Sequence, residues 1–239
     1  MKYKTEFHIH TRGSKDSILS YLILLIQCKI NKIDCIAITD HNEVNWAIKH
    51  KESFEKHGIK VIVGEEIFTS EGEIIGLFLK ECILPDLTPL ETINEIKKQN
   101  GIVYIPHPYE TYRYKTVLKE KYIDKYSNMY DLIEFHNGRN RTEEISNNQK
   151  RLQHKYKITG VVGSDAHTFF EIGRNYMMLD SIDKEHLVDS IKNCDEYKCS
   201  KCILFAHKWT KVARAIKMIE KGKINELFRI VYRKFRRRK

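Results

Sequence analysis

The sequence predicts a single α/β domain, built from repeated strand and helix units around a mostly parallel sheet. Short apolar runs alternate with segments of helical periodicity, which is typical of this fold class. The length of 239 residues is within the usual size of a one-domain α/β barrel. Several apolar runs also lead directly into polar residues, as expected where the carboxyl ends of parallel strands carry the reacting groups.

Eight segments are predicted to be strands. They are residues 6–10, 34–39, 60–63, 74–79, 102–105, 132–135, 158–162 and 176–179. Thr88-Pro89-Leu90-Glu91 is a capping box with proline at the first helical position, so it predicts the start of a helix that Gly101 ends. Gly58 similarly ends a helix that begins near Asn42.

The first predicted strand contains Phe7-His8-Ile9-His10. Because successive side chains of a regular strand point to opposite faces, His8 and His10 should share one face, while Phe7 and Ile9 pack against the other. Two imidazoles directed at one point favour a metal site over a packing role.

Composition narrows the classes of protein to consider. Hydrophobic residues make up 41% of the chain, and no apolar run approaches the roughly 20 residues that a membrane-spanning helix needs. The start of the chain lacks the pattern of a secretion signal, so we expect a cytoplasmic location. The six cysteines do not form the framework of a small secreted fold.

The cysteine-rich segment leaves one alternative open. Cys194, Cys199 and Cys202 form C-x4-C-x2-C, part of an iron–sulfur spacing, and His207 could complete a zinc site. The fourth cysteine of the cluster pattern is absent and the segment is rich in lysine. A redox or zinc module around Cys199 and Cys202 is therefore kept only as an outside reading.

The formal charge of +10 is unevenly distributed along the chain. Residues 203–239 hold 13 Lys or Arg and 2 Asp or Glu, a net of +11, which leaves residues 1–202 at −1. We therefore expect a catalytic barrel over 1–202 and a basic helical C-terminal extension over 203–239. Apolar residues at helical spacing predict two amphipathic helices there, separated at Gly222. The first should pack on the barrel, and the second could contact an anionic membrane surface, nucleic acid or a partner, or end in solvent.

Seven short motifs follow one another in the chain. They are His8-Ile9-His10, Ser14-Lys15-Asp16-Ser17, Thr39-Asp40-His41-Asn42, Gly64-Glu65-Glu66-Ile67, Pro106-His107-Pro108, Glu134-Phe135-His136-Asn137-Gly138-Arg139-Asn140 and Gly163-Ser164-Asp165-Ala166-His167. In this order they resemble the PHP family, the polymerase and histidinol phosphatase metallohydrolases, over roughly residues 3–180. The resemblance implies a distorted (β/α)7, TIM-like barrel that hydrolyses phosphate esters with two or three divalent ions.

The resemblance also implies roles for individual residues. The expected ligands of a first ion are His8, His10, Glu66 and Asp165. Glu66 would bridge to a second ion held by His107, and a third ion would be held by Asp16, His41 and His167. In Gly64-Glu65-Glu66-Ile67 the family pattern G-x-E-I selects Glu66 over Glu65.

The sixth motif departs from some relatives, which have a histidine three residues after the glutamate. Here that residue is Asn137, and the histidine is His136. Strand alternation places Glu134 and His136 on one face and Phe135 and Asn137 on the other, so a regular strand cannot direct both to the metals. Either His136 or Asn137 could be the ligand of the second ion, or that ion could bind weakly.

Mixed imidazole and carboxylate ligands suit Mn²⁺, Fe²⁺ or Zn²⁺ rather than Mg²⁺. A water shared by two such ions becomes a hydroxide near neutral pH and can attack phosphorus. Arg139 and Arg174 are candidates to bind the phosphate oxygens, because the guanidinium can donate two parallel hydrogen bonds, although either could instead form a surface ion pair. Asp40, beside His41, could orient another histidine ring.

The leading hypothesis is a phosphoesterase that acts on a small or terminal phosphate monoester, such as a nucleotide or an oligonucleotide end. A phosphodiester nuclease that uses the basic tail is the alternative among enzymes, and its activity should fall steeply with salt. A third hypothesis is a binding or regulatory module that keeps the barrel but lacks turnover, because the second ion is lost.

Overall fold

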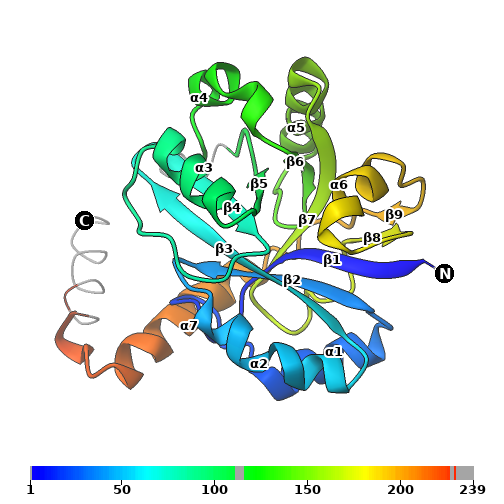
Figure 1. Cartoon of the computed structure of the whole chain (residues 1–239). Helices are drawn as coiled ribbons and strands as arrows, with labels where there is room; N and C mark the ends of the chain where they lie inside the picture. Colours follow the sequence, from blue (N-terminus) through cyan, green and yellow to red (C-terminus); the bar gives the residue numbers. More distant parts are fainter. Residues whose placement is uncertain (1, 111–115, 227–228, 230–239) are drawn as a thin grey trace.

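In this computed structural model the strands form one sheet. The structure describes residues 2–110, 116–226 and 229. Within the described residues the sheet has nine strands, of which the first seven close into a barrel through the pairing of β1 with β2 (Figure 1). They are β1 (Tyr3–Ile9), β2 (Cys35–His41), β3 (Lys60–Thr69), β4 (Gly72–Leu77), β5 (Ile102–Ile105), β6 (Leu132–Asn137), β7 (Thr159–Ala166), β8 (Tyr176–Leu179) and β9 (Tyr197–Lys198). The expected seven-stranded α/β barrel is confirmed.

The barrel is mixed rather than wholly parallel, because β4 runs antiparallel to both β3 and β5. The other barrel pairs are parallel. Strand β3 continues well past the predicted end at residue 63, and a tight turn then returns the chain along β4. The amino end of β4 therefore lies at the same rim of the barrel as the carboxyl ends of its parallel neighbours.

The last predicted strand does not belong to the barrel wall. Strand β8 pairs antiparallel with the first half of β1, from Tyr3↔Leu179 to Thr5↔Met177, while the second half of β1 pairs with β7. Strand β9 then pairs with the outer edge of β8. These two short strands extend the sheet beside the N-terminus (Figure 1).

Seven α-helices and one short 3-10 helix accompany the strands in the described part of the chain. They are α1 (Tyr21–Ile30), α2 (Asn45–Lys56), α3 (Pro89–Lys98), α4 (Glu120–Lys125), η2 (Ser127–Met129), α5 (Glu143–Tyr156), α6 (Lys184–Lys192) and α7 (Ala206–Glu220). Helices α1 and α2 lie on one side of the barrel, and α3, α4 and α5 lie on the opposite side (Figure 1). The predicted capping box is present, since Thr88 N donates to Glu91 Oε2 at 2.8 Å and Glu91 N donates to Thr88 Oγ1.

Two hydrophobic clusters form the core. One draws Phe7, Tyr104 and other side chains from all seven barrel strands, so it fills the barrel interior. The other joins the outer faces of the strands to the helices and contains Ile9 and Phe54. Strand β2 shows the alternation between them, because Cys35 and Ala37 point inward while Ile36 and Ile38 point outward.

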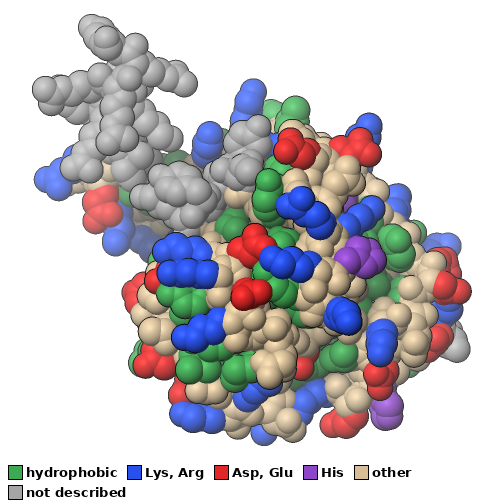
Figure 2. All heavy atoms as spheres, turned by 90° about the horizontal axis from the view of Figure 1, so that it is seen from above, with side chains coloured by type: hydrophobic (Ala, Val, Ile, Leu, Met, Phe, Trp, Pro, Cys, Tyr) green, Lys and Arg blue, Asp and Glu red, His purple; other side chains and the backbone are tan. Residues whose placement is uncertain are grey.

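The first helix predicted for residues 203–239 corresponds to α7, and its Arg214 donates to Asp16 in the loop after β1. Most of the second predicted helix lies outside the described residues, as does much of the basic cluster that was considered for membranes or nucleic acid. On the face seen in Figure 2, Lys and Arg side chains are interspersed with acidic and apolar ones. None of the helices in the described ranges has the length and apolar character needed to cross a membrane.

Candidate metal centre

The strands carry their polar residues to the site through irregular backbone. His8, His107 and Asp165 adopt the left-handed conformation, with φ of 63°, 29° and 53°. This conformation is unfavourable for residues other than glycine and persists where the surrounding structure enforces it. Side-chain atoms of these three residues nevertheless lie within 4.8 Å of one another. The strained backbone therefore directs them to one point.

The irregularity at His8 corrects the expectation of a regular first strand. The pairing of β1 with β2 shifts between Glu6 and Ile9. Phe7 belongs to the cluster inside the barrel and Ile9 to the cluster outside it, so these two residues do not share a face. His8 and His10 still meet, because the bulge in the strand turns both side chains toward the rim.

The two histidines of the first motif face each other, with their Nε2 atoms 3.0 Å apart. The Nδ1 atom of His8 lies 2.7 Å from Glu134 Oε1, so Nδ1 donates to this carboxylate and Nε2 faces the site. The Nδ1 atom of His10 lies 3.1 Å from Ser14 Oγ. At this distance the two Nε2 atoms share a proton in a hydrogen bond, and a bound cation would take the place of that proton.

The pKa values of the pair show how the electrostatics respond to this crowding. Burial opposes protonation of His8, yet the carboxylates of Glu66, Glu134 and Asp165 raise its pKa well above the ordinary value. Burial and the neighbouring rings of His167 and His41 hold the pKa of His10 well below it. The site thus has enough negative charge to favour a cation beside His8.

Glu66 lies at the centre of the cluster and is almost fully buried. Its Oε1 atom is 2.9 Å from His107 Nε2 and 3.4 Å from His8 Nε2. Its Oε2 atom is 3.0 Å from His41 Nδ1 and 3.3 Å from His10 Nε2. Burial alone would raise the pKa of Glu66, but the charges of His8 and His41 hold it well below the ordinary value. A carboxylate between four imidazoles has the position of a bridging ligand.

A second group of potential ligand atoms surrounds Asp16. Its Oδ1 atom lies 3.4 Å from His167 Nε2, and its Oδ2 atom lies 3.5 Å from His41 Nε2. The Oδ1 atom of Asp165 is 3.4 Å from His167 Nδ1 and 3.7 Å from His10 Nε2. This group is therefore continuous with the cluster around Glu66.

The buried donor set fits divalent cations. Eight of the expected ligands fall into groups whose atoms lie within 4.8 Å of one another: His8, His10, Asp16, His41, Glu66, His107, Asp165 and His167. Nitrogen from imidazole and oxygen from carboxylate, gathered at a buried point, match the ligand types of Mn²⁺, Fe²⁺ and Zn²⁺. The clusters indicate divalent metal binding without fixing the metal or the number of ions.

Glu73 also belongs to these groups, although the sequence reasoning missed it. Its carboxylate oxygens lie 3.5 Å from His41 Nδ1 and 3.5 Å from His107 Nε2. In a parallel strand, a residue this near the amino end would lie at the far end of the barrel. Because β4 is antiparallel, its amino end lies at the rim that carries the site. The short turn before Gly72 was the signal that could have indicated a hairpin.

The sixth motif is also bulged, and this changes which side chains it directs to the site. The pairing of β6 with β7 shifts between Glu134 and His136. Asn137 Nδ2 therefore donates to Glu134 Oε2 at 2.8 Å, while His136 Nε2 lies 3.3 Å from Asn175 Oδ1. The expectation that Glu134 and His136 share a face is wrong. His136 belongs to none of the groups of three or more His, Cys, Asp or Glu side chains found among the described residues, and Asn137 Oδ1 accepts a hydrogen bond from Arg139 N at 2.9 Å.

Asp40 does not orient a histidine directly. It accepts hydrogen bonds from Thr11 N at 2.6 Å, from Thr11 Oγ1 and from Ser14 N at 3.1 Å, so it holds the loop that follows β1. Ser14 Oγ, in that loop, contacts His10 Nδ1 and accepts a hydrogen bond from His41 N at 2.9 Å. The orienting contact to a ring therefore comes from Ser14.

Arg139 and Arg174 both differ from the expected phosphate contacts. Arg139 is buried, and its Nε and Nη2 atoms donate to the two carboxylate oxygens of Glu171 at 2.8 and 2.9 Å. Its Nη1 atom donates to Thr210 Oγ1 at 2.9 Å. Arg174 is directed away from the cluster, toward the carbonyl oxygen of Lys201 at 3.3 Å. The guanidinium groups of Arg139 and Arg174 therefore both donate hydrogen bonds to protein atoms.

A cavity of about 540 Å³ opens above the cluster. Asp16, His41, Glu73 and His167 line its inner side. Cationic side chains line the same cavity: Lys15, Arg139, Arg141, Lys211 and Arg214. Lys211 and Arg214 come from α7, the helix that the sequence reasoning assigned to the tail. This volume is in the range of small-molecule sites.

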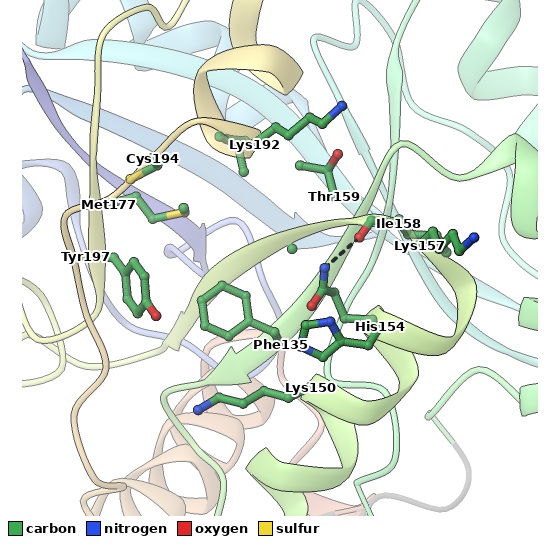
Figure 3. Close-up of a pocket in the computed structure, with 13 residues that line it drawn as sticks. Phe135, Lys150, His154, Lys157, Ile158, Thr159, Met177, Lys192, Cys194 and Tyr197 are labelled. Carbon is green, nitrogen blue, oxygen red and sulfur yellow. Dashed lines mark hydrogen bonds between the residues drawn. The ribbon is translucent and has the colours of Figure 1, made fainter.

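A second cavity, of about 480 Å³, lies between α5, the start of β7 and the segment that follows α6 (Figure 3). Lys150, Lys192 and His154 line it together with the rings of Phe135 and Tyr197. None of the described residues that line it is an aspartate or glutamate, and none lines the first cavity.

The cysteine-rich segment forms no comparable group of ligands. Cys202 Sγ lies 3.4 Å from His207 Nε2, and Cys199 is exposed. Among the described residues, the groups of three or more potential metal ligands contain no cysteine.

A family model and several known proteins are similar to this chain. A family model described as the PHP domain matches residues 6–227. Two uncharacterized proteins of Methanocaldococcus jannaschii are similar in sequence. MJ1587 is 41% identical over 116 residues, which are 44% of this chain and 68% of that protein. MJ0417 is 34% identical over 189 residues, which are 76% of this chain and 73% of that protein.

Solved structures share the fold. A two-domain protein from Bacteroides vulgatus, described as containing a predicted PHP-like metal-dependent phosphoesterase, matches with a TM-score of 0.65 and 18% identity. The match covers 81% of this chain and 63% of that longer chain.

Proposed function

Because the chain belongs to the PHP domain family, we propose that it is a metal-dependent phosphoesterase that hydrolyses a small phosphate monoester. The observation that carries this proposal is the convergence of eight imidazole and carboxylate side chains, far apart in sequence, in buried groups at one rim of the barrel. The description of the Bacteroides vulgatus protein as containing a predicted metal-dependent phosphoesterase supports the same activity.

We assign the ligands by the distances between their side-chain atoms. His8, His10, Glu66 and Asp165 would hold a first ion. His10, Asp16, His41 and His167 would hold another. Glu66, His107 and Glu73 would hold a further ion, with Glu73 supplying an oxygen in place of the imidazole nitrogen that Asn137 does not offer.

Divalent ions at these positions would supply a nucleophilic water near neutral pH and would neutralise the charge that develops on the phosphate. Side chains beside the site would orient the imidazoles that bind these ions. Glu134 accepts from His8 Nδ1 and keeps the Nε2 lone pair directed at the site, and Ser14 contacts the corresponding atom of His10. Burial of Glu66 and Asp165 keeps bulk water from competing for their oxygens.

The dimensions and charge of the cavity favour a small monoester over a nucleic acid. Its volume of about 540 Å³ suits a small ligand. Lys15, Arg141 and Arg214 line it beside the cluster and would attract the dianion of a monoester.

The test is phosphate release from a panel of phosphate monoesters and diesters, with protein loaded in turn with Mn²⁺, Fe²⁺ or Zn²⁺. We expect monoesters to be hydrolysed faster than diesters, with little dependence on salt. Steeply salt-dependent diester cleavage would favour a nuclease instead. A protein that holds metal but hydrolyses none of the esters would be a binding module, and the proposed function would be withdrawn.

A further inference from the structure

We propose that Arg214 of helix α7 is the side chain that binds the substrate phosphate, and that Arg139 holds α7 in position for this contact. The inference rests on the proposed function, since it names the phosphate-binding residue of the same site. In this arrangement helix α7, rather than a barrel loop, provides the phosphate-binding side of the active site.

The first step concerns where α7 lies. Arg214 Nη2 donates to Asp16 Oδ2 at 2.8 Å, which joins the middle of the helix to the metal cluster. One turn later, Lys217 Nζ donates to the carbonyl oxygen of Arg12, and Arg12 Nη2 pairs with Glu220 Oε1 at 2.5 Å. Contacts along successive turns therefore fix the helix against the loop that follows β1.

The second step concerns the buried clamp at the amino end of the same helix. Glu171 accepts both parallel hydrogen bonds from Arg139, and its Oε2 atom also accepts from His167 N at 3.0 Å and from Thr168 Oγ1 at 2.6 Å. Arg139 Nη1 continues the network to Thr210 of α7. The clamp thus joins α7 to the motif that carries Asp165 and His167. A guanidinium used in this way acts as a positioning group.

The third step concerns the availability of Arg214. Its side chain is 55% exposed, whereas that of Arg139 is 3% exposed. Its hydrogen bond within the described residues is to Asp16, and it lines the same cavity as Asp16, His41 and His167. An arginine with one terminal nitrogen at the cluster and the rest of its fork open to the cavity can donate two parallel hydrogen bonds to a phosphate.

The contact between Arg214 and Asp16 indicates how Arg214 would exchange this carboxylate for the substrate phosphate. Asp16 accepts from Arg214 through Oδ2 and also belongs to a group of potential metal ligands, so a cation bound at this carboxylate would compete with Arg214 for its negative charge. The substrate phosphate offers the displaced guanidinium a doubly charged acceptor at the same place. Lys211, one turn before Arg214, lines the cavity and adds positive charge on the same side.

The test is isothermal titration calorimetry of metal-loaded protein with inorganic phosphate, for wild type, Arg214→Ala and Arg214→Lys. We expect wild type to bind phosphate, Arg214→Ala to bind it about 10- to 100-fold more weakly, and Arg214→Lys to recover part of the loss. Metal content should be unchanged in all three proteins. Arg174→Ala, which removes an arginine outside the cavity, is the matched control and should bind phosphate as wild type does.

Two results would overturn the inference. One is a phosphate affinity of Arg214→Ala equal to that of wild type. The other is loss of metal from Arg214→Ala, because Arg214 would then act by holding Asp16. Phosphate binding is measured without turnover. A wild-type protein that binds phosphate through Arg214 but hydrolyses no ester would therefore contradict the proposed function and leave this inference standing.

Discussion

Two cavities of similar volume, about 540 and 480 Å³, differ in the chemistry of their walls. The cavity at the barrel rim has buried carboxylates and imidazoles at its base, where ligand atoms from several strands converge. The cavity between α5 and the segment after α6 is lined by lysines and apolar or aromatic side chains (Figure 3). Volume alone therefore does not locate the functional site. Burial of convergent polar groups does, because their desolvation is unfavourable unless a cation binds there.

The two regions also differ in backbone. At the rim, His8, His107 and Asp165 have positive φ, and strands β1 and β6 are bulged. At the other cavity, the wall comes largely from helix α5 and the regular start of β7, although Lys157 at the helix end is left-handed. Positive φ at three residues that carry the site's side chains is consistent with a geometry held by the surrounding structure.

The largest effect should come from removing a ligand at the rim. His10→Ala should lose at least one ion per chain and reduce phosphate release by more than about 100-fold, since loss of a ligand's hydrogen-bonding partner alone costs about 10- to 100-fold. His154→Ala, in the second cavity, is the matched control. Elemental analysis and phosphate release would check both. Equal activity in the two variants would remove the distinction between the cavities.

Arg139→Ala should lower the free energy of unfolding by about 3–5 kcal/mol, because it leaves the buried carboxylate of Glu171 without its partner. Urea unfolding followed by circular dichroism measures this change. Arg174→Ala removes a partly exposed arginine that donates to the carbonyl oxygen of Lys201 rather than to a carboxylate, and should change stability by less than about 0.5 kcal/mol. If Arg139→Ala were as stable as wild type, the clamp on α7 would have no energetic role.

Glu73→Gln should weaken the binding of one ion by about 10-fold or more, with the others retained. Glu65, a carboxylate in strand β3, provides the control. It is buried but accepts a hydrogen bond from Ile83 N at 2.9 Å, so Glu65→Gln should leave metal affinity unchanged. Titration of the metal-free variants with Mn²⁺ would compare them. Loss of affinity in Glu65→Gln alone would reverse the assignment.

Substitutions in the second cavity should change the rate of phosphate release least. Changing Lys150 and Lys192 together to alanine should alter phosphate release by less than about twofold, because these surface lysines lie outside the metal centre. Steady-state kinetics would detect a larger change. A large loss of activity would mean that this cavity also takes part in the reaction.

Much of the site could be predicted from the sequence, because ordered motifs at the ends of apolar runs place their side chains at one rim of a barrel. This reasoning holds for His41 at the end of β2 and for Glu66 in β3, where the pairing is regular. It also holds for helix α3, whose capping box is local in sequence.

The remaining features depend on tertiary structure. Alternation fails at Phe7 and at His136 because bulges shift the register, and bulges leave no reliable pattern in one sequence. Glu73 was missed because it lies before the predicted strand at 74–79 and because a mostly parallel sheet gives no reason to expect an antiparallel strand there. Arg214 was missed because a charge count cannot show which helix of a basic extension returns to the site.

The most direct test is a crystal structure of protein purified without chelator and soaked in Mn²⁺, with anomalous diffraction used to locate the ions. We expect two or three Mn²⁺ peaks at the barrel rim, one of them within coordination distance of His8, His10, Glu66 and Asp165. Absence of peaks there, or a peak only beside Cys199 and Cys202, would contradict the metal centre and the function proposed from it.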